Sequence, residues 1–372
     1  MTPPATGDGE RGVALALAIV VLVIGGALAA AMFFVAFEEA RLSENAGRLI
    51  QSFGVAEEGA LEAIRAWEPK VYNVHDPYPL DSETVPGGFP SHWIAAPHGT
   101  GTYGGRVYKL NGELYFIDMA GRDRRSDADS GTGIRQHVGV LVHVRPIVPG
   151  VTAALTVGKG IRGAGSITSS GDDQPPPGWG PCGPRDSATT GLRIDSNPPG
   201  PSHVAVGGLS YSQLADLATR TLPGGSHLAA VAPAVVKGRC DETVATNWGD
   251  GSHPDHACGG YVPVLHILGD ANIGGGEGQG ILLVDGDLVL QGDFLWHGLI
   301  MVGGSMRVTG SVTSDVEVWG AALVADSVLL NPALGGSLAV TYSKCAIIRV
   351  LESVASVAVL PRRGWIEAYE VP

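Results

Sequence analysis

Chemically reactive side chains are densest in the stretch 240–258, CDETVATNWGDGSHPDHAC, which holds Cys240, His253, His256 and Cys258. Two thiolates and two imidazoles can bind zinc, but their spacing here matches none of the common zinc-binding patterns. A Cys240–Cys258 disulfide would close a loop of about 19 residues and contribute roughly 3 kcal/mol through chain entropy. The sequence therefore favours the disulfide over a zinc site or free thiols, and it predicts neither a metal nor a cofactor.

The two remaining cysteines, Cys182 and Cys345, could form a second disulfide, although sequence alone does not fix the connectivity. All four cysteines follow a long apolar segment that offers a route out of the cytosol. Because disulfides persist in oxidising compartments, we expect the long C-terminal part to lie outside the cytoplasm.

Asp285, Asp287 and Asp293 form a carboxylate cluster, and paired carboxylates cleave polysaccharides on several β-helical enzymes. No Lys or Arg lies close to them in sequence to stabilise a developing anion. We expect these residues to occupy corners, where Asp side chains accept hydrogen bonds from backbone N–H groups.

A second charged cluster lies within 121–133 and mixes arginines with aspartates. It could bind a polyanion or Ca²⁺, but such a mixture is more typical of a solvated loop, which we predict here. The members are Arg122, Asp123, Arg124, Arg125, Asp127 and Asp129.

Composition and motifs exclude several functional classes. The chain carries a net charge of −13 and no basic cluster, so it is poorly suited to binding nucleic acid. It has no nucleophile elbow, no P-loop and no dinucleotide fingerprint. Gly accounts for 55 of 372 residues without a collagen period, and 44% of residues are hydrophobic, which indicates many short strands rather than disorder. No enzymatic activity is predicted.

A long N-terminal helix must position everything that follows it. Val13–Phe37 contains no charged residue and is long enough to cross a bilayer with some tilt. An apolar stripe at helical spacing then continues to Trp67, and we expect Pro69 to end one helix running from Val13 to Trp67. The residues of the stripe are Leu42, Ala46, Leu49, Phe53, Ala56, Ala60, Ile64 and Trp67.

Three interpretations of this N-terminus stay open. It could be a secretory signal cleaved after the A-x-A sequence Ala27-Leu28-Ala29, or an uncleaved single-pass anchor. The third is a prepilin-type signal, in which residues 1–12 are a leader peptide cleaved between Gly12 and Val13.

A family resemblance favours the third interpretation. The segments RGVALALAIVVLVIGGALAAAMFF, FEEARLSENAGR and AEEGALEAI, within about residues 10–66, resemble the N-terminal region of the PilX family of type IV pilus assembly proteins. The polar and small residues that carry this resemblance are Glu38, Glu39, Asn45, Ala46, Ala56, Glu57 and Glu58.

The resemblance implies a helix that packs against other pilin helices. Small residues permit close helix approach, so packing is expected at Gly25, Gly26, Ala29 and Ala30. Leu17 stands at the fifth position after the expected cleavage site, where major pilins carry the Glu that registers subunits in a filament. Incorporation into a filament therefore stays open.

Residues 68–150 are predicted to form a small antiparallel β unit. The alternating runs 106–110 and 113–117 flank Asn111-Gly112, a strong signal for a two-residue hairpin, and 136–144 reads as a third strand. We expect loops over 68–105 and 121–133. A long helix against such a sheet resembles a pilin head.

Residues 151–372 are predicted to form a parallel β-solenoid with an insertion at about 172–261, with a β-sandwich as the alternative. Short apolar strands recur between Gly-Asp and Gly-Gly corners, and one helix is expected over 210–222. The run GQGILLVDGDLVLQGDFLWHGLIMVGG also resembles β-helical parts that accompany PilX-like N-termini and, more loosely, bactofilin-type solenoids. The expected strands are 155–158, 161–167, 266–270, 280–284, 287–291, 298–302, 305–309, 316–320, 321–325 and 338–342.

These expectations combine into an α+β/all-β protein with a transmembrane and amphipathic helix, a pilin-like sheet and a β-solenoid. The resemblance implies a non-enzymatic, minor-pilin-like subunit in the inner membrane, with the membrane, other pilins and a surface polysaccharide as partners. Its role would be to initiate or decorate a filament or to present an adhesive surface. The alternatives are a surface-anchored β-helix carbohydrate-active enzyme and an envelope scaffold that polymerises through solenoid ends.

Overall fold

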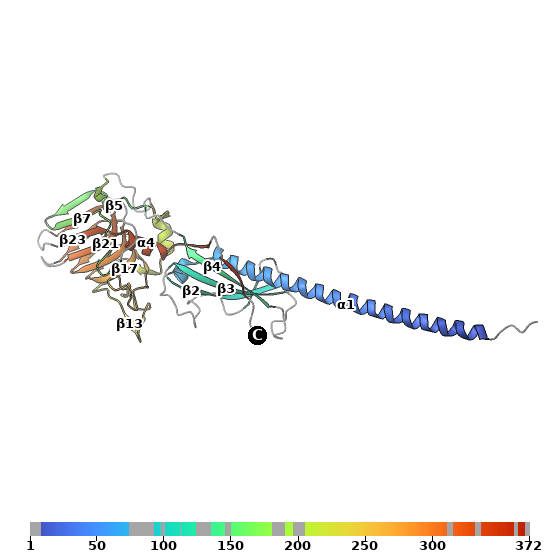
Figure 1. The fold of residues 1–372 in the computed structure, drawn as a ribbon. Helices are drawn as coiled ribbons and strands as arrows, with labels where there is room; N and C mark the ends of the chain where they lie inside the picture. The colour runs from blue at the N-terminus through green and yellow to red at the C-terminus, as the bar shows by residue number, and fades with distance from the viewer. Residues whose placement is uncertain are drawn as a thin grey trace, which may run out of the picture.

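The computed structural model describes residues 9–73, 93–96, 98, 101–111, 113–123, 135–145, 150–180, 190–195, 205–310, 315–331, 336–360 and 364–368. A single long helix leads into a body built mostly from strands (Figure 1). One antiparallel sheet lies beside the helix, and two parallel sheets lie beyond it (Figure 1).

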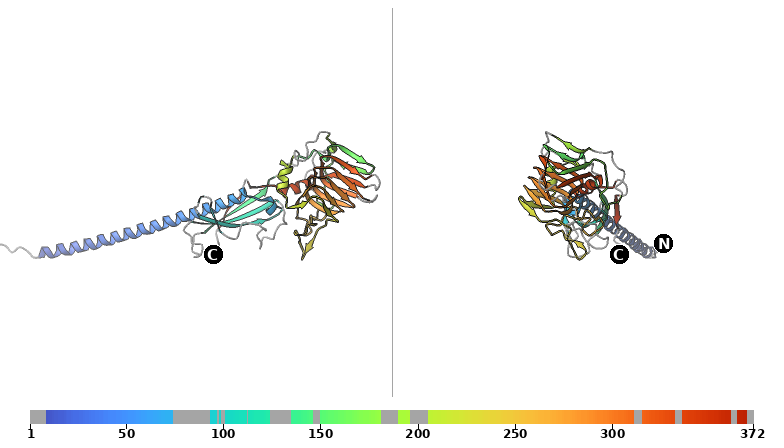
Figure 2. Two further views of the ribbon diagram at one scale, coloured as in Figure 1. Left: turned by 180° about the vertical axis from the view of Figure 1, so that it is seen from behind. Right: turned by 90° about the vertical axis from the view of Figure 1, so that its left-hand side faces the viewer.

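Helix α1 (Gly9–Arg65) has 57 residues, which corresponds to about 86 Å at 1.5 Å per residue. Its N-terminal part extends away from the strands, and its C-terminal part lies along a sheet (Figures 1 and 2). The helix ends slightly before the predicted Trp67. Pro69 does not terminate it but begins the one-turn helix α2 (Pro69–Tyr72), because a proline is well tolerated at the first helical position.

The sheet beside α1 is antiparallel, with the order β1-β2-β3-β4-β24 and with β25 also paired to β4. Buried apolar side chains on its α1-facing side, such as Tyr115, Ile117 and Val140, form one core with α1. Its strands are β1 (Ile94–Ala95), β2 (Gly101–Lys109), β3 (Leu114–Asp123), β4 (Arg135–Val144), β24 (Val357–Val359) and β25 (Trp365–Ala368).

The predicted hairpin is present, but its turn is longer than two residues. Lys109 is paired with Tyr115, and the backbone N–H groups of Leu110 and Asn111 both donate to the carbonyl of Leu114. The Asn111 side chain accepts hydrogen bonds from the N–H groups of Glu113 (2.9 Å) and Leu114 (2.8 Å). The asparagine therefore stabilises a wider Asx-type turn.

Two loop predictions in this region were too long. Strands β1 and β2 occupy part of the predicted 68–105 loop, and β3 continues to Asp123 inside the predicted 121–133 loop. The sequence did not indicate where β3 ends, because the charged residue Asp123 reads as a loop residue. In the fold Asp123 is buried by its ion pair with Arg48 of α1.

The larger part of the body consists of two parallel sheets between which the chain alternates. One has the order β11-β15-β17-β19-β21-β23-β7, with β5 beside β21 and β8 beside β5, and the other has the order β12-β16-β18-β20-β22-β6. The first sheet contains β5 (Ala153–Val157), β7 (Ser166–Ser170), β8 (Thr190–Ile194), β11 (Arg220–Pro223), β15 (Val264–Leu268), β17 (Gly276–Val284), β19 (Phe294–Val302), β21 (Asp315–Val324) and β23 (Ser337–Tyr342). The second contains β6 (Gly160–Gly163), β12 (Ser226–Leu228), β16 (Ala271–Ile273), β18 (Leu288–Gln291), β20 (Met306–Thr309) and β22 (Ser327–Leu330).

A column of glycines bends the three longest parallel strands at one level. Gly280, Gly298 and Gly320 are paired in register, with φ values of 113°, 132° and 142°. A Cβ on Gly298 would lie 2.2 Å from the Gly280 carbonyl oxygen, and one on Gly320 would lie 2.0 Å from that of Gly298. Only glycine fits such a left-handed bend at this spacing.

Several elements differ from the sequence-based expectations. The helix predicted over 210–222 is limited to α3 (Tyr211–Asp216), because the chain turns into strand β11 at Arg220. The predicted strands 316–320 and 321–325 are the single strand β21. The predicted insertion 172–261 contributes β11 and β12 to the parallel sheets.

The C-terminal part does not stay within the parallel sheets. Helix α4 (Lys344–Glu352), which the sequence did not predict, buries Ile347 and Val350 against the parallel body. The chain then returns to the antiparallel sheet, where β24 and β25 pair with β4. The antiparallel unit therefore draws strands from both ends of 68–372, in contrast to the predicted division at residue 150.

Candidate functional site

The N-terminal half of α1 presents an uninterrupted apolar surface. Every described side chain from Leu15 to Phe37 is exposed, including Leu22 at 75% and Phe33 at 80%. Among the described residues, α1 is the one helix that is long and apolar enough to cross a membrane by length and composition. None of the residues that the structure describes covers this surface.

The small residues predicted for helix packing lie on that open half. A Cβ added to Gly25 or Gly26 would meet no atom within 4 Å, and Ala29 and Ala30 are exposed. Among the described residues, these four positions are therefore left open to another surface, and helix packing there stays a prediction. The predicted cleavage between Gly12 and Val13 falls inside α1 and also stays a prediction.

The C-terminal half of α1 packs tightly on the antiparallel sheet through small residues. A Cβ on Gly121 of β3 would lie 2.2 Å from the Ser52 carbonyl oxygen and 2.4 Å from the Ala56 nitrogen. A Cβ on Gly59 of α1 would lie 2.6 Å from the Tyr103 ring. Ala56, like Ala60 and Ala63, is fully buried.

An ion pair marks the place where α1 meets the sheet. Arg48 Nε donates to Asp123 Oδ2 at 2.7 Å, and the Asp123 side chain is 1% exposed. The hydrogen bond to Asp123 raises the pKa of Arg48, so the guanidinium stays charged. Asp123 is thus not part of a solvated loop as predicted. Arg122 stacks on Trp93, and the other members of that cluster, Arg124, Arg125, Asp127 and Asp129, lie outside the described residues.

A buried polar network joins the end of α1, the antiparallel sheet and the parallel body. Asn73 accepts a hydrogen bond from Trp67 Nε1 (2.9 Å) and donates to the carbonyls of Glu352 (2.8 Å) and Ala355 (2.7 Å). Lys109 Nζ donates to the Asn73 carbonyl at 2.8 Å. Sequence reasoning missed this junction, because its members are separated by up to 282 residues.

Glu352 lies at this junction with an altered pKa. Burial, followed by the charge of Glu113, raises the pKa of its carboxyl to about 7. The residue follows Leu351, which is fully buried in the core of the parallel body.

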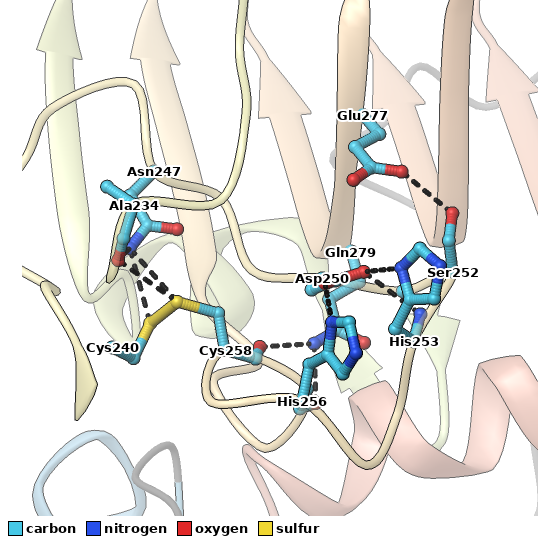
Figure 3. A network of polar contacts seen from close by, with 12 residues as sticks. Ala234, Cys240, Asn247, Asp250, Ser252, His253, His256, Cys258, Glu277 and Gln279 are labelled. Atoms are coloured by element: carbon cyan, nitrogen blue, oxygen red, sulfur yellow. Dashed lines mark hydrogen bonds and ion pairs between the residues drawn. A yellow bond between two sulfur atoms is a disulfide. The ribbon is translucent and has the colours of Figure 1, made fainter. Parts of the chain in front are cut away.

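Cys240 and Cys258 form a disulfide, with their sulfurs 2.06 Å apart (Figure 3). The buried Asn247 amide lies beside it and donates to the carbonyls of Asp241 (2.8 Å) and Ala234 (3.2 Å). With both thiols oxidised, the two-cysteine, two-histidine zinc set considered from the sequence is not available. Cys345 is also disulfide-bonded, and its expected partner Cys182 lies outside the described residues.

His253 and His256 face Asp250 instead of the cysteines (Figure 3). Asp250 Oδ1 lies 3.1 Å from His253 Nδ1, and Asp250 Oδ2 lies 3.4 Å from His256 Nδ1. Sequence reasoning overlooked Asp250. The spacing D-x-x-H-x-x-H was nevertheless visible, and it places one carboxylate and two imidazoles within one short turn.

The carboxylates predicted at corners accept hydrogen bonds there. Asp287 Oδ1 accepts from the Ser305 N–H (2.7 Å), and Asp293 Oδ1 accepts from the Asp315 N–H (3.1 Å). Asp285 Oδ1 instead binds the Tyr211 hydroxyl and His266 Nε2, each at 2.8 Å. The first two carboxylates therefore link successive turns of chain, as expected for structural corner residues.

An open groove of the parallel body gathers several other carboxylates. Its walls include Phe294 and Leu295, and Glu277 is hydrogen-bonded to Ser252 at 2.7 Å. The acidic residues that line it are Glu277, Asp293, Asp315 and Glu317.

Comparisons with known proteins identify no family for this chain. No protein-family model matches it, and no curated protein matches it. Among solved structures, it is similar to the competence-associated pilin ComZ from Thermus thermophilus, with 11% sequence identity. That match covers 86% of this chain and 97% of the ComZ chain with a TM-score of 0.24, which is too low to define a shared fold.

Proposed function

We propose that this chain is a non-enzymatic, membrane-anchored, minor-pilin-like subunit of a type IV pilus assembly. The observation that carries the proposal is the division of α1 into two halves. Leu15–Phe37 is apolar and exposed, whereas one face of the helix from Ser52 onward is buried against an antiparallel sheet. A helix whose N-terminal half is lipid-soluble and whose C-terminal half is part of the folded body is suited to packing beside similar helices.

The interpretation as a pilus subunit is favoured by the PilX-like sequence over about residues 10–66. In this proposal Gly25, Gly26, Ala29 and Ala30 contact other pilin helices, because small residues let helix backbones approach closely. The cysteine pairs support placing the body on the extracytoplasmic side of the inner membrane, where disulfides persist.

We further propose that the two parallel sheets form a β-solenoid that presents an adhesive face. The registers support it: Ile281 lies beside Leu299, which lies beside Ala321, and Leu288 of the other sheet lies beside Met306. A chain that alternates between two parallel sheets in fixed register advances by stacked coils.

Mass spectrometry of the mature chain, recovered from its own host, tests the proposal. We expect an N-terminus at Val13, carrying a methylated amine, and recovery together with other pilus proteins. A start at Ala30 would refute the proposal, since the helix would then have been removed as a secretory signal. An intact chain found in membranes without pilus proteins would leave only a plain anchor.

One observation favours a second candidate, a surface-anchored carbohydrate-active enzyme. The groove that contains Glu277 and Glu317 places several carboxylates along one face of the parallel body, an arrangement used in glycoside cleavage. Polysaccharide turnover that is lost in both Glu277→Gln and Glu317→Gln would support this candidate. Asp287→Asn is the control for a corner carboxylate, because its side chain is engaged with the Ser305 N–H.

A further inference from the structure

Asp250, His253 and His256 bring three potential metal ligands to one point of the surface (Figure 3). Each residue contributes one ligand atom, and these atoms all lie within 4.8 Å of one another. The two imidazole rings are stacked with their centroids 4.6 Å apart, and both present Nδ1 to the carboxylate.

Two separations in this group, each measured to a different oxygen of Asp250, are close to those of a tetrahedral metal site. Zinc bonds of about 2.0–2.1 Å in a tetrahedron separate neighbouring ligand atoms by about 3.3 Å. The separations from Asp250 oxygens to His253 Nδ1 and His256 Nδ1 are 3.1 and 3.4 Å. Small side-chain adjustments would therefore suffice to place one cation among the three groups.

The charge of Asp250 is an independent indication. Its side chain is only 8% exposed, and among the described residues no Lys or Arg forms an ion pair with it. A buried carboxylate is costly unless a positive charge compensates it. The His253 backbone N–H donates to Asp250 Oδ1 at 2.9 Å, and this group carries no full charge. The two imidazoles that face Asp250 are 57% and 66% exposed and so remain open to an ion from solvent.

The surrounding turn is held in place before any ion binds. The Cys240–Cys258 disulfide fixes one end of it, and the Asp250 N–H donates to the Cys258 carbonyl at 3.0 Å. Trp179 Nε1 donates to the Gly251 carbonyl at 2.7 Å, and the Gln279 amide donates to the Gly259 carbonyl at 2.7 Å. Because these contacts already hold the turn in place, binding of an ion would cost little conformational entropy.

We propose that Asp250, His253 and His256 bind one divalent first-row transition-metal ion, with Zn²⁺ as the representative, and leave a fourth position open to solvent. Two imidazoles favour Zn²⁺ over Ca²⁺ or Mg²⁺, which prefer oxygen ligands. The nearby cysteines do not compete, because their thiols are consumed in the disulfide. The site is independent of the pilin-like function proposed above.

Calorimetric titration of the untagged, full-length chain in detergent with Zn²⁺, without reductant, tests this site. We expect binding of one ion per chain and a loss of affinity of at least tenfold in His253→Ala and in His256→Ala. Because both side chains are exposed, these variants should keep the fold, which circular dichroism checks. A tetrahedral Co²⁺ absorption band that disappears in both variants is the second expected readout.

His227→Ala is the matched control, since His227 is an exposed histidine of β12 outside this turn. We expect it to bind Zn²⁺ as the unchanged chain does. The proposal is overturned if the unchanged chain binds no Zn²⁺, or if His253→Ala and His256→Ala both bind it with unchanged affinity.

Discussion

Single residues stabilise the strand-built body through contacts that the sequence indicated only in part. The Cys240–Cys258 pair was predictable, because a short loop between two cysteines has a known entropic gain. The partnership of Asp250 with two histidines was not predicted, because the carboxylate becomes a partner only once the turn is packed under Gln279. Likewise, the sequence around Asp123 indicated a loop, because its ion pair with Arg48 of α1 forms only in the folded chain.

Replacing Cys240 and Cys258 together by Ser tests the contribution of the disulfide. We expect the free energy of unfolding to fall by about 3 kcal/mol, since the unfolded chain regains the freedom of an 18-residue separation. Chemical denaturation in detergent, followed by tryptophan fluorescence, measures the change, because the buried Trp248 lies inside this loop. Unchanged stability would mean that hydrogen bonds around Asn247 alone hold the loop.

Glu352 makes the stability of the fold depend on pH. Its pKa of about 7 in the folded chain exceeds its ordinary value of 4.5, so the folded state holds a proton that the unfolded state releases between these values. The contribution of Glu352 to stability should therefore be complete below pH 4.5 and should fall by about 3 kcal/mol as pH rises to 7. Glu352→Gln should remove this decline, as measured by thermal unfolding at several pH values. A variant with the same pH profile as the unchanged chain would refute this assignment.

At the scale of elements, hydrophobic periodicity predicted the helices and strands whose residues repeat with a clear local pattern. The helical stripe that ends at Trp67 and the alternation around Asn111 gave α1 and the β2–β3 hairpin nearly correctly. Short elements were less visible: β24 has three residues, and β22 (Ser327–Leu330) lacks a clear polar alternation. The helix predicted over 210–222 is present but ends at Asp216, because pairing of Arg220 with Leu265 overrides the helical pattern beyond it.

Two glycine-to-alanine substitutions test how closely α1 packs against β3. Gly121→Ala should cost about 1–3 kcal/mol in unfolding free energy, because its Cβ would overlap the Ser52 carbonyl of α1. Gly54→Ala is the matched control: its Cβ would meet nothing within 4 Å, and alanine favours the helix by about 1 kcal/mol. Equal effects of the two substitutions on denaturation midpoints would contradict the close packing.

For the molecule as a whole, the return of the C-terminus to the first sheet could not be read from the sequence. Strand β4 pairs with β3 on one edge and with β24 and β25 on the other. Pairings between residues more than 200 positions apart leave no local signature, and so the predicted boundary at residue 150 ignored them.

Deleting residues 364–372 tests this closure. The Leu141 N–H donates to the Gly364 carbonyl at 2.7 Å, so its hydrogen exchange should become much faster in the shortened chain. The Val144 N–H, which donates to the Glu113 carbonyl at 2.8 Å, should keep its protection and serves as the internal control. Exchange measured by mass spectrometry after proteolysis distinguishes the two. Unchanged exchange at Leu141 would mean that β25 does not protect β4.

The placement of β24 beside β4 has a mechanical consequence for a tethered protein. The chain enters the parallel body after β4 and leaves it into β24, so two neighbouring antiparallel strands form its stem (Figure 1). In the membrane-anchored subunit proposed above, tension between α1 and a load on the parallel body would thus be divided over two covalent connections.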